Sequence, residues 1–532
     1  MRTTTSVTLA SRLAGAAWGH LVGDATGVPY EFAPATAVPG DVAFGAPGGP
    51  WRKPPGTWSD DGALMLALLD SLLGRGFDTD DQGARAVAWM ADGAYTPGWE
   101  GLFDIGTTTA LALQAIRSGV PAVDAGPTHD RASGNGSLMR ILPLALVERD
   151  GFEGPFVDDR GETRAGVDDA TLVAHAHAAS RVTHGHARCQ VACALYSLVV
   201  RRLLMADGPA TAMRTARRTL RQIYAADAAL AAHLAALDEL EAWKGRSGRG
   251  YVLDSFWSAW DAFAGARSYR GTIERAIRYG NDTDTTAAIA GGLAGARWGW
   301  EGIPTDWRRG MRGAEVATPL VDRLVSTTGA RTSTASPLRV DLVSLDGIDR
   351  LDGARLGITF LPGKKRDGYS GHHWRDVDLD AGTLRDGGWD VLFLLVEDLE
   401  LRWCHVPDLA GALASAGVEL IRRPVRDPRI PSRAQEPRYR RAIRGLVARV
   451  RAGESIAIAC RGGIDRSGMT AACLLVEAGL PTEAAIDRVH AGRHHSLTYP
   501  EQLAYVRAWT GDEEVRDRVW GLEPSPRRSA PR

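Results

Sequence analysis

The chain has 532 residues, of which 44% are hydrophobic and 24% are charged. This composition is typical of a soluble globular protein, and the length allows two or three domains. The formal net charge is -1, from 63 basic and 64 acidic residues, so no global field favours nucleic acid or an anionic membrane surface.

Three features bear on where the protein works. The chain begins with one arginine and several hydroxyl residues, and Arg12 interrupts the apolar stretch that follows, so the sequence predicts no signal peptide. We find no uncharged apolar run of about 18 residues and expect no membrane span. The cysteines are odd in number and scattered, which favours a reducing cytoplasm; they are Cys189, Cys193, Cys404, Cys460 and Cys473.

Residues 9–313 are rich in Ala, Leu and Gly and almost lack β-branched alternation. This pattern predicts consecutive helices. One apolar stripe passes through Ile223, Leu230, Leu234 and Leu237, a spacing that predicts the buried face of a single helix. We therefore expect an all-α domain over residues 1–316.

The composition changes after this helical part. The run Ser326–Pro337 is small and polar, which is typical of a linker, and we expect a linker over residues 317–337. A disordered tail is expected at residues 516–532, because that segment is rich in proline, serine and arginine.

Between linker and tail, the periodicity is that of strands and helices. Short buried strands are predicted at Val391–Val396, Val418–Ile421 and Ser455–Ala459, with helical stretches such as Tyr439–Val450 between them. Alternating strands and helices predict an α/β domain with a central, mostly parallel sheet. Residues 338–515 are expected to form this second domain, so the fold class is multidomain.

Two acidic clusters in the helical part lie more than two hundred residues apart. Ser59, Asp60 and Asp61 precede a predicted helix, and so does the segment Gly280–Thr286. Either cluster alone has the residues of a helix N-cap, but two carboxylates at each site exceed what a cap needs. If the four carboxylates converge, a divalent cation must offset their repulsion, and oxygen ligands favour Mg²⁺, Mn²⁺ or Ca²⁺ over zinc.

Further motifs occur around the two clusters, in the order Gly23–Phe32, Trp58–Asp61, Asp104–Thr109, Gly134–Pro143, Thr183–His184 and Gly280–Thr285. This series resembles the ADP-ribosylglycohydrolase family, and the likeness spans about residues 8–313. The resemblance implies an all-α domain that binds two Mg²⁺ ions, or Mn²⁺ in their place. It also implies hydrolysis of the bond between C1″ of the distal ribose of ADP-ribose and an acceptor.

The resemblance assigns roles to individual residues. It implies metal ligation by Ser59, Asp60, Asp61, Asp282, Asp284 and Thr285. Glu31 falls where some family members place an acidic residue that activates water or contacts a ligand. The segments expected to line the substrate cleft contribute Asp104, Asn135, Gly136, Ser137, Met139 and His184.

Three positions depart from the family pattern. Ser59 and Gly62 stand where the family usually has threonine, and Asn281 stands where a second glycine is usual. Ser59 keeps a hydroxyl and a carbonyl, so ligation survives there. Gly62 removes a hydroxyl and changes the fine geometry expected of the site.

A second motif follows the predicted strand that ends at Cys460. Five residues separate Cys460 from Arg466, which begins a predicted helix. A loop of this length turns successive backbone N–H groups towards a phosphate, and the helix N-terminus adds positive potential. Cys460 is then a candidate nucleophile and Arg466 a two-pronged phosphate ligand. The other candidate phosphate-binding residues are Arg461, Gly462, Gly463 and Ser467; the alternative is a buried cysteine at a strand end.

An aspartate upstream completes this candidate site. Asp427 lies on a proline-rich segment after a predicted strand and is a candidate general acid. From about residue 339 to 515 the chain is similar to dual-specificity cysteine phosphatases, nearest to kinase-associated phosphatases; the supporting segments are Leu361–Lys365, Trp374–Leu379 and Tyr499–Gln502. The resemblance implies hydrolysis of a phosphomonoester through a phosphocysteine intermediate.

Two residues of this loop are unusual for such phosphatases. Ala459 stands where histidine usually precedes the nucleophile, and Asp465 precedes Arg466, as in some phosphatases of lipid or inositol phosphates. Together the motifs predict a cytoplasmic two-domain hydrolase whose substrates are an ADP-ribosylated protein, nucleic-acid end or small molecule, and a phosphomonoester. The alternative is a noncatalytic ADP-ribose-binding module tethered to an active phosphatase.

Overall fold

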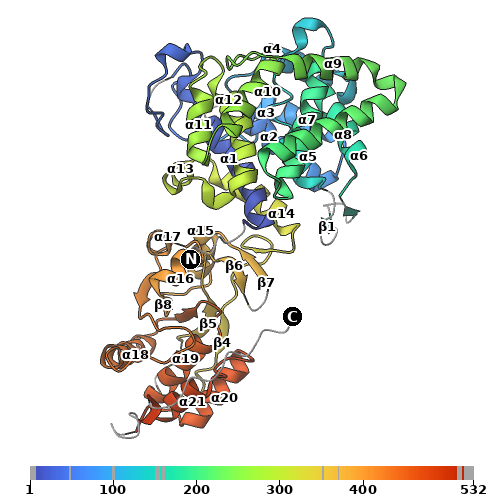
Figure 1. Cartoon of the computed structure of the whole chain (residues 1–532). Helices are drawn as coiled ribbons and strands as arrows, with labels where there is room; N and C mark the ends of the chain where they lie inside the picture. Colours follow the sequence, from blue (N-terminus) through green and yellow to red (C-terminus); the bar gives the residue numbers. More distant parts are fainter. Residues whose placement is uncertain are drawn as a thin grey trace. The chain divides into compact units, whose positions relative to one another are not determined.

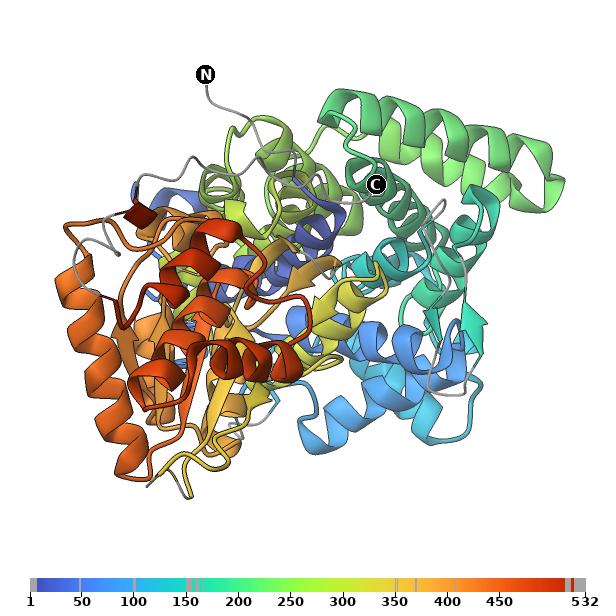
Figure 2. The ribbon, with the colours of Figure 1, turned by 90° about the horizontal axis from the view of Figure 1, so that it is seen from below.

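The computed structural model describes residues 7–46, 49–98, 102–149, 156–157, 162–164, 166–349, 351, 353–368, 371–406, 408–511 and 518–520. The chain divides into two compact units, Met1–Gly329 (unit 1) and Ala330–Arg532 (unit 2). Unit 1 can be followed from blue to yellow-green in Figure 1, and unit 2 from yellow to red in Figure 2. Each is described by itself.

Unit 1 is a helical bundle, which confirms the expected helical N-terminal domain. Its α-helices are α1 (Leu9–Gly27), α2 (Asp60–Arg75), α3 (Thr79–Asp92), α4 (Thr107–Arg117), α5 (Leu142–Val147), α6 (Asp169–Arg181), α7 (Ala187–Leu204), α8 (Pro209–Ala226), α9 (Ala231–Ala242), α10 (Val252–Ala264), α11 (Tyr269–Ile277), α12 (Thr283–Trp298), α13 (Thr305–Arg309) and α14 (Ala314–Ser326). Short 3₁₀ turns occur at Val28–Tyr30, Ala35–Ala37, Ala122–Asp124, Asp130–Ala132, Ala228–Leu230 and Trp300–Gly302. Strands β1 (Phe156–Val157) and β2 (Thr163–Arg164) pair antiparallel.

Helices α1 and α12 pack backbone against backbone at the centre of the bundle. Glycines recur at every fourth position of α1, at Gly15, Gly19, Gly23 and Gly27, and so lie on one face. A Cβ at Gly23 would lie 2.2 Å from the Ala287 carbonyl oxygen, and one at Gly27 would lie 2.4 Å from the Asp284 Cα. The glycines therefore set how closely α1 approaches the start of α12.

The predicted stripe from Ile223 to Leu237 does not form a single helix. Helix α8 ends at Ala226, and α9 begins at Ala231. Asp227 between them has extended backbone angles, and its carboxylate accepts a hydrogen bond from the Ala229 N–H at 2.8 Å. The prediction was wrong here because aspartate favours capping the next helix over continuing the previous one.

The segment expected to be a linker begins inside a helix. Residues 317–326 belong to α14, which buries Ala317, Leu320 and Val321. These apolar side chains pack into unit 1, so composition misplaced the first part of the linker. The division between the two units falls after Gly329, whose φ of 76° is in the left-handed region that glycine favours.

Unit 2 contains a five-stranded sheet of order β4 (Asp341–Val343), β5 (Leu356–Phe360), β10 (Ile456–Cys460), β8 (Val391–Leu394) and β9 (Glu419–Arg422). The pairs β5–β10, β10–β8 and β8–β9 are parallel, whereas β4 is antiparallel to β5. The mostly parallel sheet is therefore as expected. A second sheet has the order β3 (Arg331–Thr332), β7 (Gly371–Trp374) and β6 (Lys365–Gly368).

Helices cover both faces of the five-stranded sheet. They are α15 (Val377–Asp386), α16 (Asp398–Trp403), α17 (Leu409–Ala416), α18 (Glu436–Arg451), α19 (Asp465–Glu477), α20 (Thr482–Gly492) and α21 (Pro500–Arg507). One apolar core joins Ile456 and Ile458 of β10 to α18 and α19. The other core joins Ala457 and Ala459 to α15 and α17. Alternate residues of β10 thus serve opposite cores, as the pleat of a strand requires.

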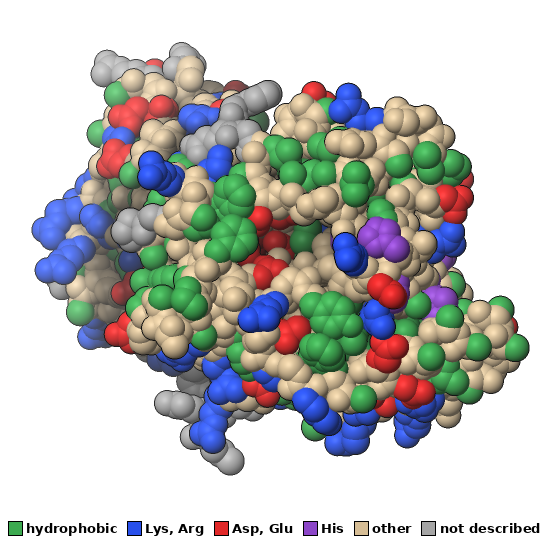
Figure 3. Space-filling model, turned by 90° about the horizontal axis from the view of Figure 1, so that it is seen from above, with side chains coloured by type: hydrophobic (Ala, Val, Ile, Leu, Met, Phe, Trp, Pro, Cys, Tyr) green, Lys and Arg blue, Asp and Glu red, His purple; other side chains and the backbone are tan. Residues whose placement is uncertain are grey.

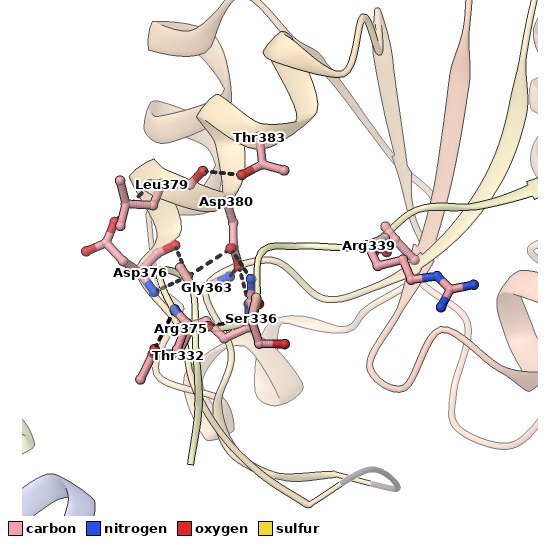
Figure 4. A network of polar contacts seen from close by, with 12 residues as sticks. Thr332, Ser336, Arg339, Gly363, Arg375, Asp376, Leu379, Asp380 and Thr383 are labelled. Carbon is pink, nitrogen blue, oxygen red and sulfur yellow. Dashed lines mark hydrogen bonds and ion pairs between the residues drawn. The ribbon is translucent and has the colours of Figure 1, made fainter. Parts of the chain in front are cut away.

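A buried polar network fixes the turn before β6 (Figure 4). Arg375 donates to Asp380 Oδ1 and Oδ2 at 2.6 and 2.8 Å and to the Ser336 carbonyl at 2.7 Å. Asp380 also accepts from the Gly363 N–H at 2.8 Å. Both charged side chains are almost fully buried. The network therefore holds Gly363, and with it the next residue, Lys364, in place.

The expected tail at residues 516–532 falls largely outside the described residues. Residues 518–520 are described and belong to the packed structure. Val519 is buried, and the Trp520 indole N–H donates to the Pro431 carbonyl at 3.0 Å. The prediction of a tail was wrong for these three residues, because Val519 and Trp520 pack within unit 2. Among the described helices, none combines the length and apolar character needed to cross a bilayer.

Candidate active sites

The first acidic cluster forms the N-terminus of α2. Ser59 is the N-cap, and Asp60 and Asp61 are in the first turn. The buried Asp24 of α1 accepts hydrogen bonds from the backbone N–H groups of Ser59, at 3.0 Å, and Gly62, at 2.8 Å. Asp24 thus fixes the start of α2; it lies within the motif Gly23–Phe32, but no role was predicted for it.

The second cluster, at the start of α12, meets the first. Asp61 Oδ2 accepts from the hydroxyls of Ser59 and Thr285, each at 3.1 Å. At the other side, the Asn135 amide donates to Asp282 Oδ2 at 2.8 Å. The structure therefore brings the two predicted clusters together, although they are far apart in the chain.

The carboxylate oxygens are close enough to share cations. Ligand atoms of Asp60, Asp61 and Asp104 lie within 4.8 Å of one another, and so do those of Glu31, Asp104 and Asp284. The buried atoms Asp61 Oδ1 and Asp284 Oδ2 have no hydrogen-bond partner. Unpartnered buried oxygens fit a hard divalent cation. Asp104, assigned by resemblance only to the cleft, takes part in both groups.

Burial and mutual repulsion dominate the electrostatics of this cluster. Burial, followed by repulsion from neighbouring carboxylates, raises the pKa of Asp24, Asp60 and Asp61 well above its ordinary value. The same causes raise the pKa of Asp282 to about 7 and that of Glu31 to about 10. A bound cation would reverse this repulsion, since it favours the charged forms.

The clustered carboxylates border a cavity of about 610 Å³. Figure 3 shows a hollow with acidic side chains at its base. Among the predicted site residues, those that line the cavity are Glu31, Asp60, Asp104, Asn135, Gly136, Met139, His184, Asp282 and Thr285. Ser59, Asp61 and Asp284 lie behind this lining. Lining residues that sequence reasoning missed include Phe32 and Arg249.

Ser137 does not line the cavity as expected. Its side chain is fully buried, and its hydroxyl accepts from the Ser180 hydroxyl at 2.9 Å and the Cys193 thiol at 3.5 Å. The residue therefore supports the wall from behind. The neighbouring His184 does reach the cavity, and burial lowers its pKa to about 3, so the imidazole is neutral at physiological pH.

Three non-glycine residues beside this cavity have left-handed backbone conformations. They are Phe32, Asp104 and Asn281, with φ of 61°, 63° and 61°. Such conformations cost energy and concentrate at functional sites. Asparagine is among the residues that tolerate this region best, which accounts for Asn281 where the family usually has glycine.

Packing gives a physical reason for Gly62. A Cβ there would lie 2.7 Å from Cγ and Cδ1 of Trp58 and 2.8 Å from Leu21 Cδ2. The Trp58 indole is fully buried, and its N–H donates to the Tyr95 carbonyl at 2.9 Å. The indole thus occupies the space that a side chain at position 62 would need. Gly62 follows from this packing and does not by itself indicate a noncatalytic module.

In unit 2, the predicted cysteine loop joins β10 to α19. Cys460 is the last residue of β10, and its sulfur lies 3.4 Å from the Ser467 hydroxyl. Gly463 has φ of 63°, and a Cβ there would lie 2.5 Å from the Thr359 carbonyl. Gly463 is thus required both by its backbone conformation and by close packing.

Arg466 is held in a fixed orientation. Its two terminal nitrogens donate to Glu400 Oε1 and Oε2, each at 2.8 Å, and one also donates to the Val425 carbonyl at 2.7 Å. Burial raises the pKa of Glu400, but hydrogen bonds and charge from Arg466 outweigh it, so the net shift is downward. Glu400 is therefore an anionic partner that orients the guanidinium, and it was not foreseen from the sequence.

The predicted general acid lies at the same loop. Asp427 accepts from Arg461 at 2.9 Å, and its other oxygen is 3.2 Å from Arg466 Nε. The Lys364 ammonium donates to the Arg461 carbonyl at 3.3 Å. Burial lowers the pKa of Lys364 to about 8. The structure thus brings the candidate nucleophile, phosphate ligand and acid together and adds Lys364.

The two unusual loop residues have structural roles. Ala459 is fully buried in the core with α15 and α17. Asp465 Oδ1 accepts from both the N–H and the hydroxyl of Thr498, at 3.0 and 3.1 Å. Asp465 therefore ties the start of α19 to the segment before α21.

These features define the class of unit 1 as a mainly helical protein with a carboxylate-rich candidate cation site. The chain belongs to the ADP-ribosylglycohydrolase family, whose model matches residues 5–334. The chain is 28% identical to an ADP-ribosylarginine hydrolase Tri1 of Pseudomonas putida, and the match covers 56% of this chain and 73% of that protein. It is also 27% identical to an ADP-ribosyl-[dinitrogen reductase] glycohydrolase of Rhodospirillum rubrum, over 56% of this chain and 88% of that protein.

Two solved structures are each similar to part of the chain. An ADP-ribosylglycohydrolase-related protein complex is 30% identical and covers 60% of this chain and 99% of its own, with a TM-score of 0.47. A kinase-associated phosphatase with its catalytic cysteine replaced by serine is 24% identical. It covers 35% of this chain and 99% of its own, with a TM-score of 0.29.

Proposed function

We propose that unit 1 is a metal-dependent hydrolase that removes ADP-ribose from an ADP-ribosylated acceptor. The observation that carries the proposal is the convergence of two acidic helix starts at one cavity, with Asp61 Oδ1 and Asp284 Oδ2 buried and unpartnered. The names of the relatives, which include hydrolases of ADP-ribosyl linkages, support the choice of substrate.

In this proposal the residues that would hold Mg²⁺ or Mn²⁺ are Ser59, Asp60, Asp61, Asp104, Asp282, Asp284 and Thr285; the short distances among the carboxylates and their hydroxyl neighbours support it. Divalent cations bound there would supply positive charge that offsets the carboxylate repulsion and holds ribose hydroxyls. The donor set consists of oxygen atoms, as these cations require.

The side chains around the cavity have separate tasks in glycoside hydrolysis. Glu31 has one oxygen engaged by the Trp51 indole N–H, which fixes the carboxyl group at the cavity. There it would position the attacking water and, with cations bound nearby to favour its charged form, accept a proton from that water. Negative charge close to C1″ stabilises the oxocarbenium character of the transition state. Arg249, exposed at the same cavity, offers a cation for the pyrophosphate.

The test is release of ADP-ribose from substrates modified on arginine, serine or nucleic-acid ends, with Mg²⁺ or Mn²⁺ present. Asp61→Asn and Asp284→Asn should abolish release, whereas the exposed Asp124→Asn should not. In calorimetric titrations with Mg²⁺ or Mn²⁺ alone, Asp61→Asn and Asp284→Asn should likewise lose metal binding, whereas Asp124→Asn should keep it. No release from any substrate would refute the hydrolase, and tight ADP-ribose binding without turnover would favour the noncatalytic module.

We propose further that residues 338–515 form a cysteine-dependent phosphatase. The observation that carries this proposal is the meeting of Cys460, Arg466 and Asp427 at one loop that begins α19. The Cys460 thiolate attacks phosphorus while the bond to the leaving oxygen breaks and Asp427 protonates that oxygen. Water, deprotonated by Asp427, then cleaves the phosphocysteine, and Ser467 donates a hydrogen bond to the departing sulfur.

Hydrolysis of a generic aryl phosphate tests the second activity. Cys460→Ser should abolish it, and Asp427→Asn should lower kcat most for substrates with poor leaving groups. The matched control is Cys473→Ser, a fully buried cysteine of α19 outside the loop. Activity that survives Cys460→Ser would show that this loop does not catalyse the reaction.

A further inference from the structure

Unit 2 has a large hollow of its own, and no residue of the cysteine loop is among its lining residues. This groove, of about 1110 Å³, is bordered by the end of β9, the segment after it and one face of α18. Its lining residues, among those that the structure describes, are Ile421, Arg422, Arg423, Pro424, Val425, Pro431, Ala434, Gln435, Arg438, Tyr439, Arg441, Ala442, Gly445, Leu446 and Arg449. They include no acidic side chain, so the lining is strongly basic.

The lining arginines divide into two kinds. Arg422 pairs with Asp398 at 2.6 Å, and Arg449 pairs with Glu419 at 2.7 Å. By contrast, Arg423, Arg438 and Arg441 are exposed. Within the described part of the chain, none of these three guanidinium groups contacts a carboxylate; that of Arg423 donates to the Arg422 carbonyl. Three guanidinium groups are therefore available to an anionic ligand.

The base of the groove is apolar. Val425, Tyr439 and Leu446 are almost fully buried beneath it, and Ile421 and Ala442 are partly exposed. The Tyr439 hydroxyl is engaged with Thr470 at 2.7 Å, so the groove presents carbon surface rather than hydroxyls. A ligand that fits must therefore combine apolar groups with negative charge.

Gly445 keeps the groove open in the middle of α18. It lies on the same helix face as Arg438, Arg441, Ala442 and Arg449, at the spacing of one face. A glycine inside a helix costs about 1 kcal/mol relative to alanine. A Cβ at Gly445 would meet no atom within 4 Å, so packing inside unit 2 does not require the glycine. The space above it admits another chain close to the helix.

We propose that the groove binds an extended acidic segment of a partner protein. Its Asp or Glu side chains would pair with Arg423, Arg438 and Arg441, since guanidinium and carboxylate form two-pronged hydrogen bonds. Its apolar side chains would contact the base of the groove. Single-stranded nucleic acid fits less well, because the described lining residues include no exposed aromatic ring on which bases could stack.

The groove adjoins the candidate phosphatase loop without including it. Val425 lines the groove, and its carbonyl accepts a hydrogen bond from Arg466 at 2.7 Å. Arg423 and Pro424 lie directly before the segment that carries Asp427. A bound segment would thus lie beside the reacting groups. Binding at the groove requires none of the residues of the cysteine loop, so it does not depend on phosphatase activity.

Binding is tested with a fluorescent peptide of alternating glutamate and leucine and the full chain, by anisotropy. Arg438→Glu combined with Arg441→Glu should weaken binding at least roughly tenfold, because charge reversal at a contact costs both attraction and pairing. The control pair is Arg402→Glu and Arg451→Glu, which carries the same charge change at exposed residues outside the groove and should leave the affinity unchanged.

A steric variant gives an independent test. Gly445→Leu should block the groove and weaken the same peptide roughly tenfold without loss of folding stability, since leucine suits a helix and the space is open. The matched control is Gly382→Leu in α15, where a Cβ would approach only the Arg385 guanidinium, at 3.9 Å. Cys460→Ser should bind the peptide as the parent does.

Three results would overturn the proposal: no binding of the acidic peptide, binding that both groove variants leave intact, or equal binding of a lysine–leucine peptide. A single-stranded oligonucleotide that binds more tightly than the peptide, with the same loss in both variants, would show that the groove serves nucleic acid instead.

Discussion

Replacing Gly62 by threonine, the residue usual in the family, should destabilise unit 1. The new Cβ would lie 2.7 Å from Trp58 and 2.8 Å from Leu21, well inside van der Waals contact. Trp58 cannot easily move, because its N–H is hydrogen-bonded to Tyr95 and the far edge of its ring packs against Gly313. Overpacking of this kind costs about 1–3 kcal/mol, and a fixed neighbour favours the upper part of that range.

The expected shift in melting temperature follows from the size of the unit. At about 2.1 cal/mol/K per residue, the unfolding entropy of unit 1 is roughly 0.7 kcal/mol/K. A loss of about 2–3 kcal/mol of unfolding free energy therefore lowers Tm by about 3–4 °C. Calorimetry of the full chain measures this shift. Gly208→Thr is the control, because Gly208 is the N-cap of α8 and its Cβ position is open.

A double variant decides whether Trp58 is the cause. In a Trp58→Leu background, which is destabilised by its own cavity, the additional cost of Gly62→Thr should fall close to zero. An unchanged Tm for the single variant would refute the packing argument. So would an equal cost in both backgrounds, because the strain would then arise elsewhere.

Three further predictions concern charged groups. Glu400→Gln leaves Arg466 without its bidentate partner. The kcat/KM of the proposed phosphatase should fall at least roughly tenfold, and unit 2 should lose about 3 kcal/mol of unfolding free energy. Unchanged kinetics and an unchanged urea unfolding curve would contradict this. Lys364 is charged below its pKa of about 8, so KM for an aryl phosphate should rise above pH 8 in the parent, and Lys364→Met should remove that rise. His177 has its pKa lowered from 6.5 to about 3 by burial; the unfolded state then takes up the proton first, and stability is lost as pH falls from 6.5 towards 3. At pH 5 the loss is about 2 kcal/mol, from about 1.4 kcal/mol per pH unit, and His177→Gln should lose less stability than the parent between pH 8 and pH 5.

The residues of both candidate sites that could be predicted were those whose relative positions follow from their spacing along the chain. Asp60 and Asp61, like Asp282 and Asp284, stand at helix starts where capping chemistry and charge are visible in the sequence. Cys460 and Arg466 are joined by a loop of fixed length, so their meeting needs no tertiary information. In these cases the backbone between the residues determines the geometry.

Residues that act across the fold were missed for the opposite reason. Glu400 meets Arg466 and Lys364 meets Arg461 only because β8, β10 and the turn before β6 pack together. Asp24 is one carboxylate in a long buried helix, with no neighbouring charge to single it out. Ser137 was misassigned because the motif around it is continuous, whereas the cavity wall takes only some of its residues. Composition likewise could not show that α14 extends into the expected linker.

The glycine face of α1 has a consequence for variation at a distance. At Gly15, Gly23 and Gly27 the atoms nearest to an added Cβ are backbone atoms of α12 or of the turn after it, so no flexible side chain there could move aside for a methyl group. Alanine at Gly27 would push directly on Asp284, whereas alanine at Gly15 would act about 18 Å further along the helix, at 1.5 Å per residue. A side chain added at that far end would tilt the whole of α12 and so change the distances among the carboxylates at its start. For the proposed cation site, substitutions along this helix face should therefore change cation affinity, although the substituted positions contact neither ligand nor cation.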